Sequence, residues 1–308
     1  MNFTNLKILC YHGVTNSVSK GIENFSGKHI EVEIFYRQID FLKKNCTILS
    51  MDEVAELSMQ KKTWPKNPVA ITFDDGFKNN ISVAAPILNE LDVPATFYIC
   101  PGMIGSDQIF WVDKIEACIN LTKEKSFKLD MNGEMEFLVE SHQSKINSVQ
   151  KIKNFCKNVS ADQKNQIIVD LINRTNINPN SSCAENYQIM SWDDVCSLDE
   201  SNLFIIGGHS NKHEIFTKQN KEEIYRDIKN SLEKLRSHLD QTVKHYSYPE
   251  GQMNHFDEYV IQQLKLFNIA CCPSSIEGSN EPTVDLFHLR RYMIGFEELA
   301  FDEIFSKD

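Results

Sequence analysis

The chain has 308 residues, of which 41% are hydrophobic, and a formal net charge of -11 at pH 7. This length and composition predict one large or two smaller globular domains, and no low-complexity tract argues for disorder. The negative charge excludes nucleic acid and anionic membrane surfaces as general partners, because both require a basic surface.

The predicted elements alternate between strands and helices. Short apolar runs bounded by turns predict strands, and apolar residues at helical spacing predict helices between several of them. In chain order these are a strand at 7–12, helices at 35–45 and 51–57, a strand at 69–73, a helix at 81–92, strands at 95–100 and 204–209, a helix at 221–239, and strands at 244–249 and 269–272. The alternation predicts parallel strands in a barrel-like or open α/β domain, with functional groups at the C-terminal strand ends.

Local signals support two of these helices. Phe35, Ile39 and Leu42 fall on one side of the first helix, which predicts that this side is buried. Ser50 and Glu53 have the spacing of a capping box at the start of the second helix.

Residues 121–185 differ from the rest of the chain. They are rich in Lys, Asn and Ser and have a helix-like pattern with little strand signal. We interpret them as a helical insertion or lid within a single barrel domain spanning residues 1–308.

The cysteines and the first residues bear on the compartment. The nine cysteines are irregularly spaced without a C-x-x-C pair, which indicates free thiols in a reducing environment. Residues 1–14 lack the basic start and the cleavage site of a secretory signal. No run approaches the roughly 18 apolar residues of a membrane helix. We therefore expect a cytoplasmic protein without a transmembrane segment.

Two adjacent carboxylates, Asp74 and Asp75, follow the apolar run VAITF and precede Gly76, which permits a sharp turn. Two neighbouring carboxylates repel each other, which raises one pKa unless a cation lies beside them. A metal ion could bind one carboxylate and leave the other as a base. The alternative is a solvated Asp-Gly turn.

A second acidic pair, Asp193 and Asp194, has a simpler interpretation. Ser191 has the position of an N-cap, and Asp194 then falls at the third helical position. Negative charge at a helix start is favoured by the helix dipole, so this pair is interpreted as structural.

The stretch GGHSNKH places His209 at the end of an apolar run and His213 four residues later. If the intervening residues form a turn, both imidazoles can reach one ion together with Asp75. Two imidazoles and one carboxylate are a recurring ligand set for a divalent first-row metal. We therefore predict one divalent ion, zinc before cobalt, nickel or iron, bound by Asp75, His209 and His213.

At this point the sequence resembles the polysaccharide deacetylase family, carbohydrate esterases related to the nodulation deacetylases. The segments that carry the resemblance are ILCYHGV, VAITFDDGFKNNISVAAPILNELDVPATFYI, GGHSNKH, YSYPEG and LRRYMI, in the family's order. The resemblance implies a distorted (β/α)7 barrel and a metal-dependent hydrolase that removes acyl groups, usually N-acetyl, from amino sugars. It implies that Asp74 is the catalytic base and that Asp75, His209 and His213 bind the metal.

The segment YSYPEG resembles the family's groove wall, which implies that Tyr248, Pro249, Glu250 and Gly251 contact substrate and that the Glu250 N–H faces the oxyanion. Many members have an aromatic residue where this chain has Glu250 and an arginine where it has Ser247. A stacking wall is therefore absent at this position, which weakens the case for a chitin-like substrate.

The opening Tyr-His resembles a branch of the family in which an N-terminal histidine is the general acid. The family's late L-x-x-H motif has no clear match, and His288 is a poor substitute. We therefore predict His12 as the acid, although an isolated histidine there would be interpreted as structural. Arg291 matches an arginine common in this branch and would orient Asp74.

These features predict hydrolysis of a small acyl group from an intracellular amino sugar, in nucleotide-linked, lipid-linked or another form, for surface polysaccharide synthesis. The alternatives are a sugar deformylase, a ureide-type amidohydrolase on the same fold, and a sugar-binding protein without turnover. A magnesium phosphotransferase is disfavoured because two histidine ligands suit a softer ion. The oligomeric state is left open.

Overall fold

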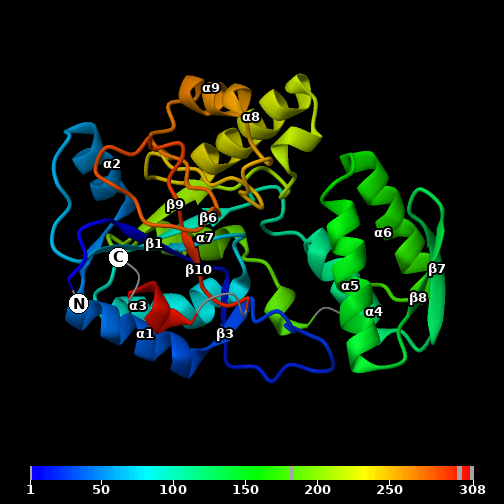
Figure 1. Ribbon diagram of the computed structural model, residues 1–308. Coiled ribbons are helices and arrows are strands. Elements are labelled where there is room, and N and C mark those ends of the chain that lie inside the picture. Colours follow the sequence, from blue (N-terminus) through cyan, green and yellow to red (C-terminus); the bar gives the residue numbers. More distant parts are fainter. Residues whose placement is uncertain (1, 181–183, 297–299, 306–308) are drawn as a thin grey trace.

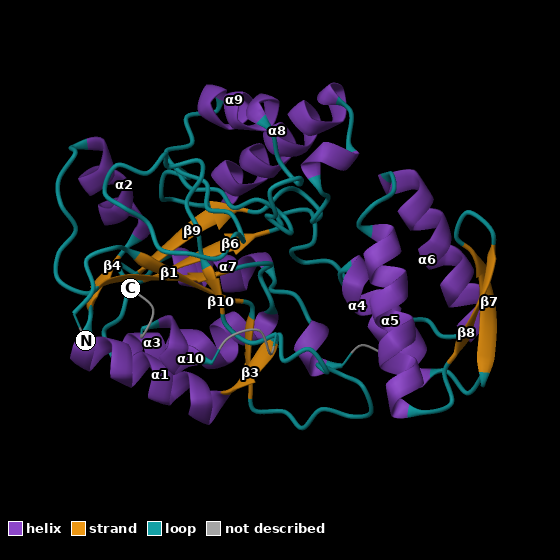
Figure 2. Cartoon of the chain, in the orientation of Figure 1, coloured by secondary structure: helices purple, strands orange, loops and turns teal. Residues whose placement is uncertain are grey.

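A parallel sheet lies at the centre of the molecule, with helices on both sides of it (Figure 1, Figure 2). The structure is a computed structural model that describes residues 2–180, 184–296 and 300–305. Within these residues the hydrogen-bonded strand order is β10-β1-β5-β6-β9, and β4 pairs with the first half of β5. Every strand pair of this sheet is parallel, which confirms the predicted α/β class.

The strands of the central sheet are β1 (Lys7–Tyr11), β4 (Thr47–Leu49), β5 (Pro68–Phe73), β6 (Ala95–Ile99), β9 (Phe204–Gly208) and β10 (Tyr292–Met293). Two smaller sheets pair β2 (Gly13–Thr15) with β3 (His29–Glu31) and β7 (Ser126–Asp130) with β8 (Glu134–Leu138). The α-helices are α1 (Val32–Asn45), α2 (Met51–Met59), α3 (Ala85–Glu90), α4 (Trp111–Leu121), α5 (His142–Cys156), α6 (Ala161–Thr175), α7 (Trp192–Asp199), α8 (Lys221–His238), α9 (Glu258–Leu266) and α10 (Phe301–Ile304). Shorter helical turns are η1 (Asn80–Ala84), η2 (Glu185–Tyr187) and η3 (Phe216–Lys218).

Beyond β9 the sheet continues through single parallel bridges instead of full strands. Gly208 pairs with Tyr246, and His245 pairs with Cys271. The two predicted strands that contain these last three residues therefore keep strand pairing at isolated positions only. No ladder of strands closes the ring within the described part of the chain, so the architecture is an open, distorted form of the predicted (β/α)7 barrel.

The central strands form where the sequence predicts them because they are apolar on both faces. Every residue of β1, β5 and β6 is buried, as expected for parallel strands covered by helices. Helix α1 covers one face with Phe35, Ile39 and Leu42, as predicted. The predicted capping box of α2 is present, since the Ser50 side chain accepts a hydrogen bond from the Glu53 N–H.

The acidic pair at the start of α7 is structural, as predicted. The Ser191 hydroxyl accepts from the Asp194 N–H, and the Asp194 carboxylate accepts from the Ser191 N–H at 2.8 Å. Asp194 also lies 2.5 Å from Lys78 Nζ. This pair therefore caps a helix and contributes nothing to the site described below.

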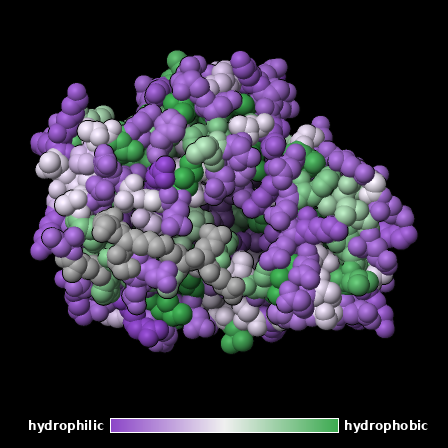
Figure 3. All heavy atoms as spheres, in the orientation of Figure 1, coloured by the Kyte–Doolittle hydropathy of each residue, from purple (hydrophilic) through white to green (hydrophobic). Residues whose placement is uncertain are grey.

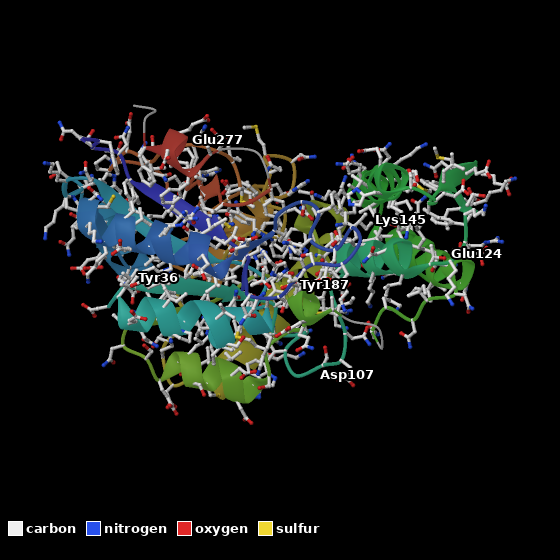
Figure 4. All side chains as sticks on the ribbon, turned by 90° about the horizontal axis from the view of Figure 1, so that it is seen from below. Tyr36, Asp107, Glu124, Lys145, Tyr187 and Glu277 are labelled. Atoms are coloured by element: carbon white, nitrogen blue, oxygen red, sulfur yellow. The ribbon has the colours of Figure 1, made fainter. Side chains whose placement is uncertain are left out.

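Residues 111–175, called the insertion below, form a separate body beside the barrel. Figure 4 shows it from below, with Lys145 and Glu124 on the insertion, Tyr36 on the barrel and Tyr187 between them. It has its own apolar core, which includes Ile115, Phe127, Phe137, Val149 and Leu171. That the whole chain is a single domain stays a prediction.

The insertion is not wholly helical, because β7 and β8 form an antiparallel hairpin. This hairpin was not predicted from the sequence. Each strand has five residues and exposes charged side chains on one face, and Lys128 pairs with Glu134 across the strands at 2.7 Å. The sequence does carry the signal, because apolar and polar residues alternate on both sides of Asn132-Gly133, a typical hairpin turn.

Two further observations concern the cysteines and the helices. The eight cysteines that the structure describes are free thiols, as predicted; Cys183 lies outside the described residues. None of the described helices is both long enough and apolar enough to cross a bilayer.

The glycines at the end of β9 are required by close packing. A Cβ atom on Gly207 would lie 2.6 Å from the Tyr98 ring and 2.8 Å from the His245 carbonyl oxygen. Because a backbone oxygen cannot move aside, we expect Gly207→Ala to lower the free energy of unfolding by about 1–3 kcal/mol. Urea denaturation measures this, and an unchanged midpoint would contradict the close packing of β9, the strand that ends just before His209.

Candidate active site

The turn after β5 brings Asp74 and Asp75 to the C-terminal edge of the sheet. Asp75 has a φ of 81° and Gly76 a φ of 92°, and both values lie in the left-handed region. For a non-glycine residue this conformation is strained and needs support from its surroundings. Both carboxylates are buried. The alternative of a solvated turn is therefore wrong.

Asp75 faces the two predicted histidines. Its Oδ1 atom lies 3.6 Å from His209 Nε2 and 3.4 Å from His213 Nε2. The other ring nitrogen of His209, Nδ1, is 3.0 Å from the Ser247 carbonyl oxygen, which fixes the ring with Nε2 turned toward Asp75. The three residues thus converge as predicted.

The donor set fits a divalent metal ion. Asp75, His209 and His213 each offer a ligand atom, and these atoms all lie within 4.8 Å of one another. Asp75 Oδ1 is buried and has no hydrogen-bond partner among the described residues. One carboxylate oxygen and two imidazole nitrogens are typical ligands of zinc with open positions.

Burial controls the protonation of these three residues. It raises the pKa of Asp75 to about 7, with Asp74 adding to the effect and His209 and Lys28 opposing it. It also lowers the pKa values of His209 and His213 below the usual range, so both imidazoles are neutral near neutral pH. The histidines are therefore ready to bind a metal, whereas Asp75 must first lose a proton below pH 7.

This state predicts how metal affinity depends on pH. Below pH 7 a bound ion must displace the proton of Asp75, and above pH 7 it need not. We expect zinc affinity to rise about tenfold per pH unit up to pH 7 and to level off above it. Competition with a chromogenic chelator between pH 5.5 and 8 measures this, and a flat profile would contradict the assignment of Asp75.

Asp74 is held in the opposite state. Arg291 donates two hydrogen bonds to it, at 2.8 Å to Oδ1 and 2.6 Å to Oδ2, and the Ser247 hydroxyl donates at 3.3 Å. Burial opposes ionisation, but the charge of Arg291 and the hydrogen bonds it donates hold the pKa of Asp74 well below its usual range. Asp74 is therefore a fixed, ionised carboxylate, 3.8 Å from His209 Nε2.

Arg291 itself is fully buried and immobile. Besides Asp74, its guanidinium donates to the Ser274 carbonyl at 2.7 Å and to the Ser247 hydroxyl at 2.9 Å. The predicted role of Arg291 in orienting Asp74 agrees with this geometry. The adjacent carboxylates thus differ because one has a guanidinium partner and the other faces two neutral imidazoles.

His12 follows β1 and lines the cavity that Asp74, Asp75, His209 and His213 also line. Donor atoms of His12, Asp74 and Cys10 lie within 4.8 Å of one another, and Nδ1 of His12 is buried without a hydrogen-bond partner in the described chain. Its ring packs edge-on against Phe296. Burial lowers the pKa of His12 to about 3 against the pull of Asp74. The position fits the predicted acid, but the imidazole is neutral in the free protein.

The predicted substrate-binding segment only partly faces the cavity. Glu250 lines it and pairs with Lys157 at 2.6 Å. The prediction for the Tyr248 side chain is wrong, because this ring is fully buried in the core, stacks on Phe256 and donates its hydroxyl to the Phe287 carbonyl. A strand-like segment alternates its side chains, so Tyr248 points away from the site.

Pro249 and Gly251 shape the backbone of this segment. Pro249 is buried, and Gly251 has a φ of 54° and passes so close to Ser275 that a Cβ atom would lie 2.6 Å from its backbone nitrogen. Their contribution to the site is therefore through backbone position.

Sequence reasoning missed several residues of the site. Ser247 orients both His209 and Asp74, and Lys28 lines the cavity while pairing with Asp113 at 2.6 Å. No motif marks them, since Ser247 stands where the family resemblance leads one to expect an arginine, and Lys28 comes from an irregular loop. Ser247 lies in the predicted strand at 244–249, but the sequence does not show which side chains of that strand face the site.

The residues converge on a cavity of about 460 Å³ between the barrel and the insertion. Figure 3 shows the molecular surface hollowed between these two bodies. Polar side chains of loop 24–28 and of α5 line the cavity together with the metal-binding group, and Phe25 and Phe296 contribute aromatic surface.

Comparison with known protein families shows to which family the chain with this site belongs. A family model described as polysaccharide deacetylase matches residues 61–151 and 159–270, well over half of the chain. The chain belongs to the polysaccharide deacetylase family. The match spans the carboxylate pair, both histidines of the candidate metal site and the Pro-Glu-Gly segment, so this member is a carbohydrate deacetylase by family.

Solved structures of deacetylases share the fold. The deacetylase PplD of Streptococcus pyogenes, in complex with acetate, has a TM-score of 0.63 at 16% identity, covering 98% of this chain and 97% of that one. IcaB from Ammonifex degensii has 0.61 at 16% identity, covering 95% and 92%. A de-N-acetylase from Aggregatibacter actinomycetemcomitans has 0.61 at 16% identity, covering 98% and 99%. The search of curated proteins gave no match.

Proposed function

We propose that this deacetylase hydrolyses the N-acetyl group of an amino sugar with one divalent ion held by Asp75, His209 and His213. The observation that supports it most is the division of labour between two adjacent carboxylates. Asp75 presents an unpartnered oxygen to two neutral imidazoles, whereas Asp74 is kept ionised by Arg291. One carboxylate is thus free to bind a metal while its neighbour remains a base.

A divalent ion at this site, zinc before cobalt, nickel or iron, would polarise the amide carbonyl and lower the pKa of water. Asp74 accepts the proton of the attacking water. Because Arg291 and Ser247 hold both oxygens of Asp74, the carboxylate cannot turn away from the reacting atoms. Asp74 is therefore held in the orientation in which it can take the proton of water, which lowers the barrier to that transfer.

The departing amine needs a proton, and His12 is placed to deliver it. Since the imidazole is neutral in the free protein, it must first receive that proton. Asp74 is a close source once it has taken the proton of water, with ligand atoms of the two residues within 4.8 Å. We therefore assign His12 as an acid that is charged during turnover by the proton that Asp74 has taken.

The cavity lining supports binding of a sugar ring with hydroxyl groups. Asn24, Gln150 and Asn154 offer amide donors and acceptors, and Phe25 and Phe296 offer apolar faces for a sugar ring. We propose an intracellular amino sugar used in surface polysaccharide synthesis, nucleotide-linked or lipid-linked. The free thiols of the described cysteines support a reducing compartment.

Release of acetate from a panel of acetylated substrates tests this proposal. The panel contains N-acetylglucosamine oligomers and nucleotide-linked and lipid-linked N-acetyl amino sugars, each incubated with zinc-loaded protein. We expect acetate from at least one of them and none after chelation. Release of formate from a formylated analogue alone would support the deformylase alternative, and binding without any release would support a sugar-binding protein.

A further inference from the structure

The insertion forms one side of the active-site cavity. Its apolar core, to which Ile22 of the loop before β3 also contributes, makes it a packed unit instead of an isolated loop. It stands beside the barrel in both views of the chain (Figure 1, Figure 4). Val112 of α4 and Gln150 and Asn154 of α5 line the same cavity as the metal-binding group. Substrate that reaches the metal site therefore lies against the insertion.

Two ion pairs fasten the insertion to the loops that carry the site. Lys157, directly after α5, lies 2.6 Å from Glu250, and Lys164 in α6 lies 2.5 Å from Glu214, the neighbour of His213. The exposed side-chain fractions are 34% for Lys157 and 14% for Glu250 in the first pair, and 6% for Lys164 and 25% for Glu214 in the second. Partly buried pairs are screened less by water and salt than surface pairs. These two ion pairs, called the clasp below, therefore hold the loops of Glu250 and Glu214 against the insertion.

The other side of the cavity is fastened as well. Lys28 pairs with Asp113 of α4 at 2.6 Å, and the Asn24 N–H donates to Glu116 of α4 at 2.8 Å. The Tyr187 hydroxyl also donates to Glu116. The loop that precedes β3 is therefore tied to the insertion, and the cavity is walled on this side too.

We propose that the insertion encloses a terminal N-acetylated amino sugar, with room for one or two sugar units, and that an internal residue of a long polymer does not fit. This inference rests on the proposed function for the acyl group but on the walls of the cavity for the length of the substrate. A volume of about 460 Å³ is at the small end of ligand cavities, which span about 300–1,000 Å³. An extended polymer would need a groove that continues beyond these walls.

Binding measured against sugar length tests the inference separately from turnover. Zinc-loaded Asp74→Asn protein is titrated by calorimetry with N-acetylglucosamine oligomers of one to six units, and acetate release by the unmodified protein is followed in parallel. We expect affinity to rise from one unit to two and then to stay within about twofold. Affinity that keeps rising beyond three units, or no binding of any oligomer, would overturn the inference. A plateau at two units, with no acetate released from these oligomers or from the nucleotide-linked and lipid-linked sugars of the panel, would support it while removing the proposed function.

Breaking the clasp is the second arm. Lys157→Met/Lys164→Met should lose the preference for short oligomers, with affinity for the two-unit sugar falling about tenfold. Lys128→Met is the matched control, because it removes an ion pair to Glu134 in the exposed hairpin. Retention of the unmodified length profile in the double variant would overturn the role of the clasp. Should the double variant fail to fold, the length profile of Asp74→Asn decides alone.

Discussion

Asp74→Asn protein is expected to keep its metal and to lose turnover by about 100- to 10,000-fold, the range contributed by a positioned general base. An amide of the same shape cannot take the proton of water. Asp75, His209 and His213 are untouched, so the metal site remains. Single-turnover acetate release, with metal content determined on the same sample, measures both effects.

The second acidic pair supplies the matched control for this experiment. Asp193→Asn changes an exposed carboxylate that also stands beside another aspartate. Asp193 lies in the first turn of α7 and does not line the cavity. Its turnover should equal that of the unmodified protein. Full activity in Asp74→Asn, with normal folding and metal content, would remove Asp74 from the mechanism.

Arg291→Met is expected to cost about 3–5 kcal/mol of unfolding free energy, because it leaves the buried Asp74 carboxylate without its cation. The low folded-state pKa of Asp74 stabilises the protein above the unfolded pKa of about 3.9, and this contribution disappears as pH falls through the folded-state value. The variant loses this contribution wherever the unmodified protein has it, so its deficit shrinks at low pH. The pKa of Asp74 should also rise, which moves the acid limb of the pH–rate profile to higher pH.

Two further variants separate charge from geometry at this position. Arg291→Lys keeps the charge but cannot make the paired hydrogen bonds to Asp74, so we expect an intermediate loss of stability and activity. Arg290→Met changes an exposed neighbour and should be close to neutral. Urea denaturation and pH–rate profiles measure the series. Equal effects of Arg290→Met and Arg291→Met would contradict the specific support of Asp74.

Much of the barrel could be predicted because its strands are buried on both faces. The runs of β1, β5, β6 and β9 are mostly apolar, only five or six residues long and bounded by turns, which favours buried strands over helices. The convergence of Asp75, His209 and His213 also followed, because the C-terminal ends of parallel strands share one edge of the sheet.

The remaining features depend on contacts between distant residues. Glu250 is understandable only beside Lys157, which lies more than ninety residues earlier in the chain. Tyr248 was predicted to contact substrate, whereas its neighbour Ser247 is the residue that faces the site. The sequence does not show which of two neighbours in an irregular strand faces inward. The neutral state of His12 follows from burial, which a motif alone does not report.

Metal content tests the central claim most directly. Protein purified without chelators is analysed by elemental mass spectrometry beside His209→Ala/His213→Ala, with His288→Ala as a control for an exposed histidine. We predict about one zinc, cobalt, nickel or iron ion per chain in the unmodified protein and the control, and none in the double variant. No metal in the unmodified protein even after its addition, or full occupancy in the double variant, would contradict the metal centre.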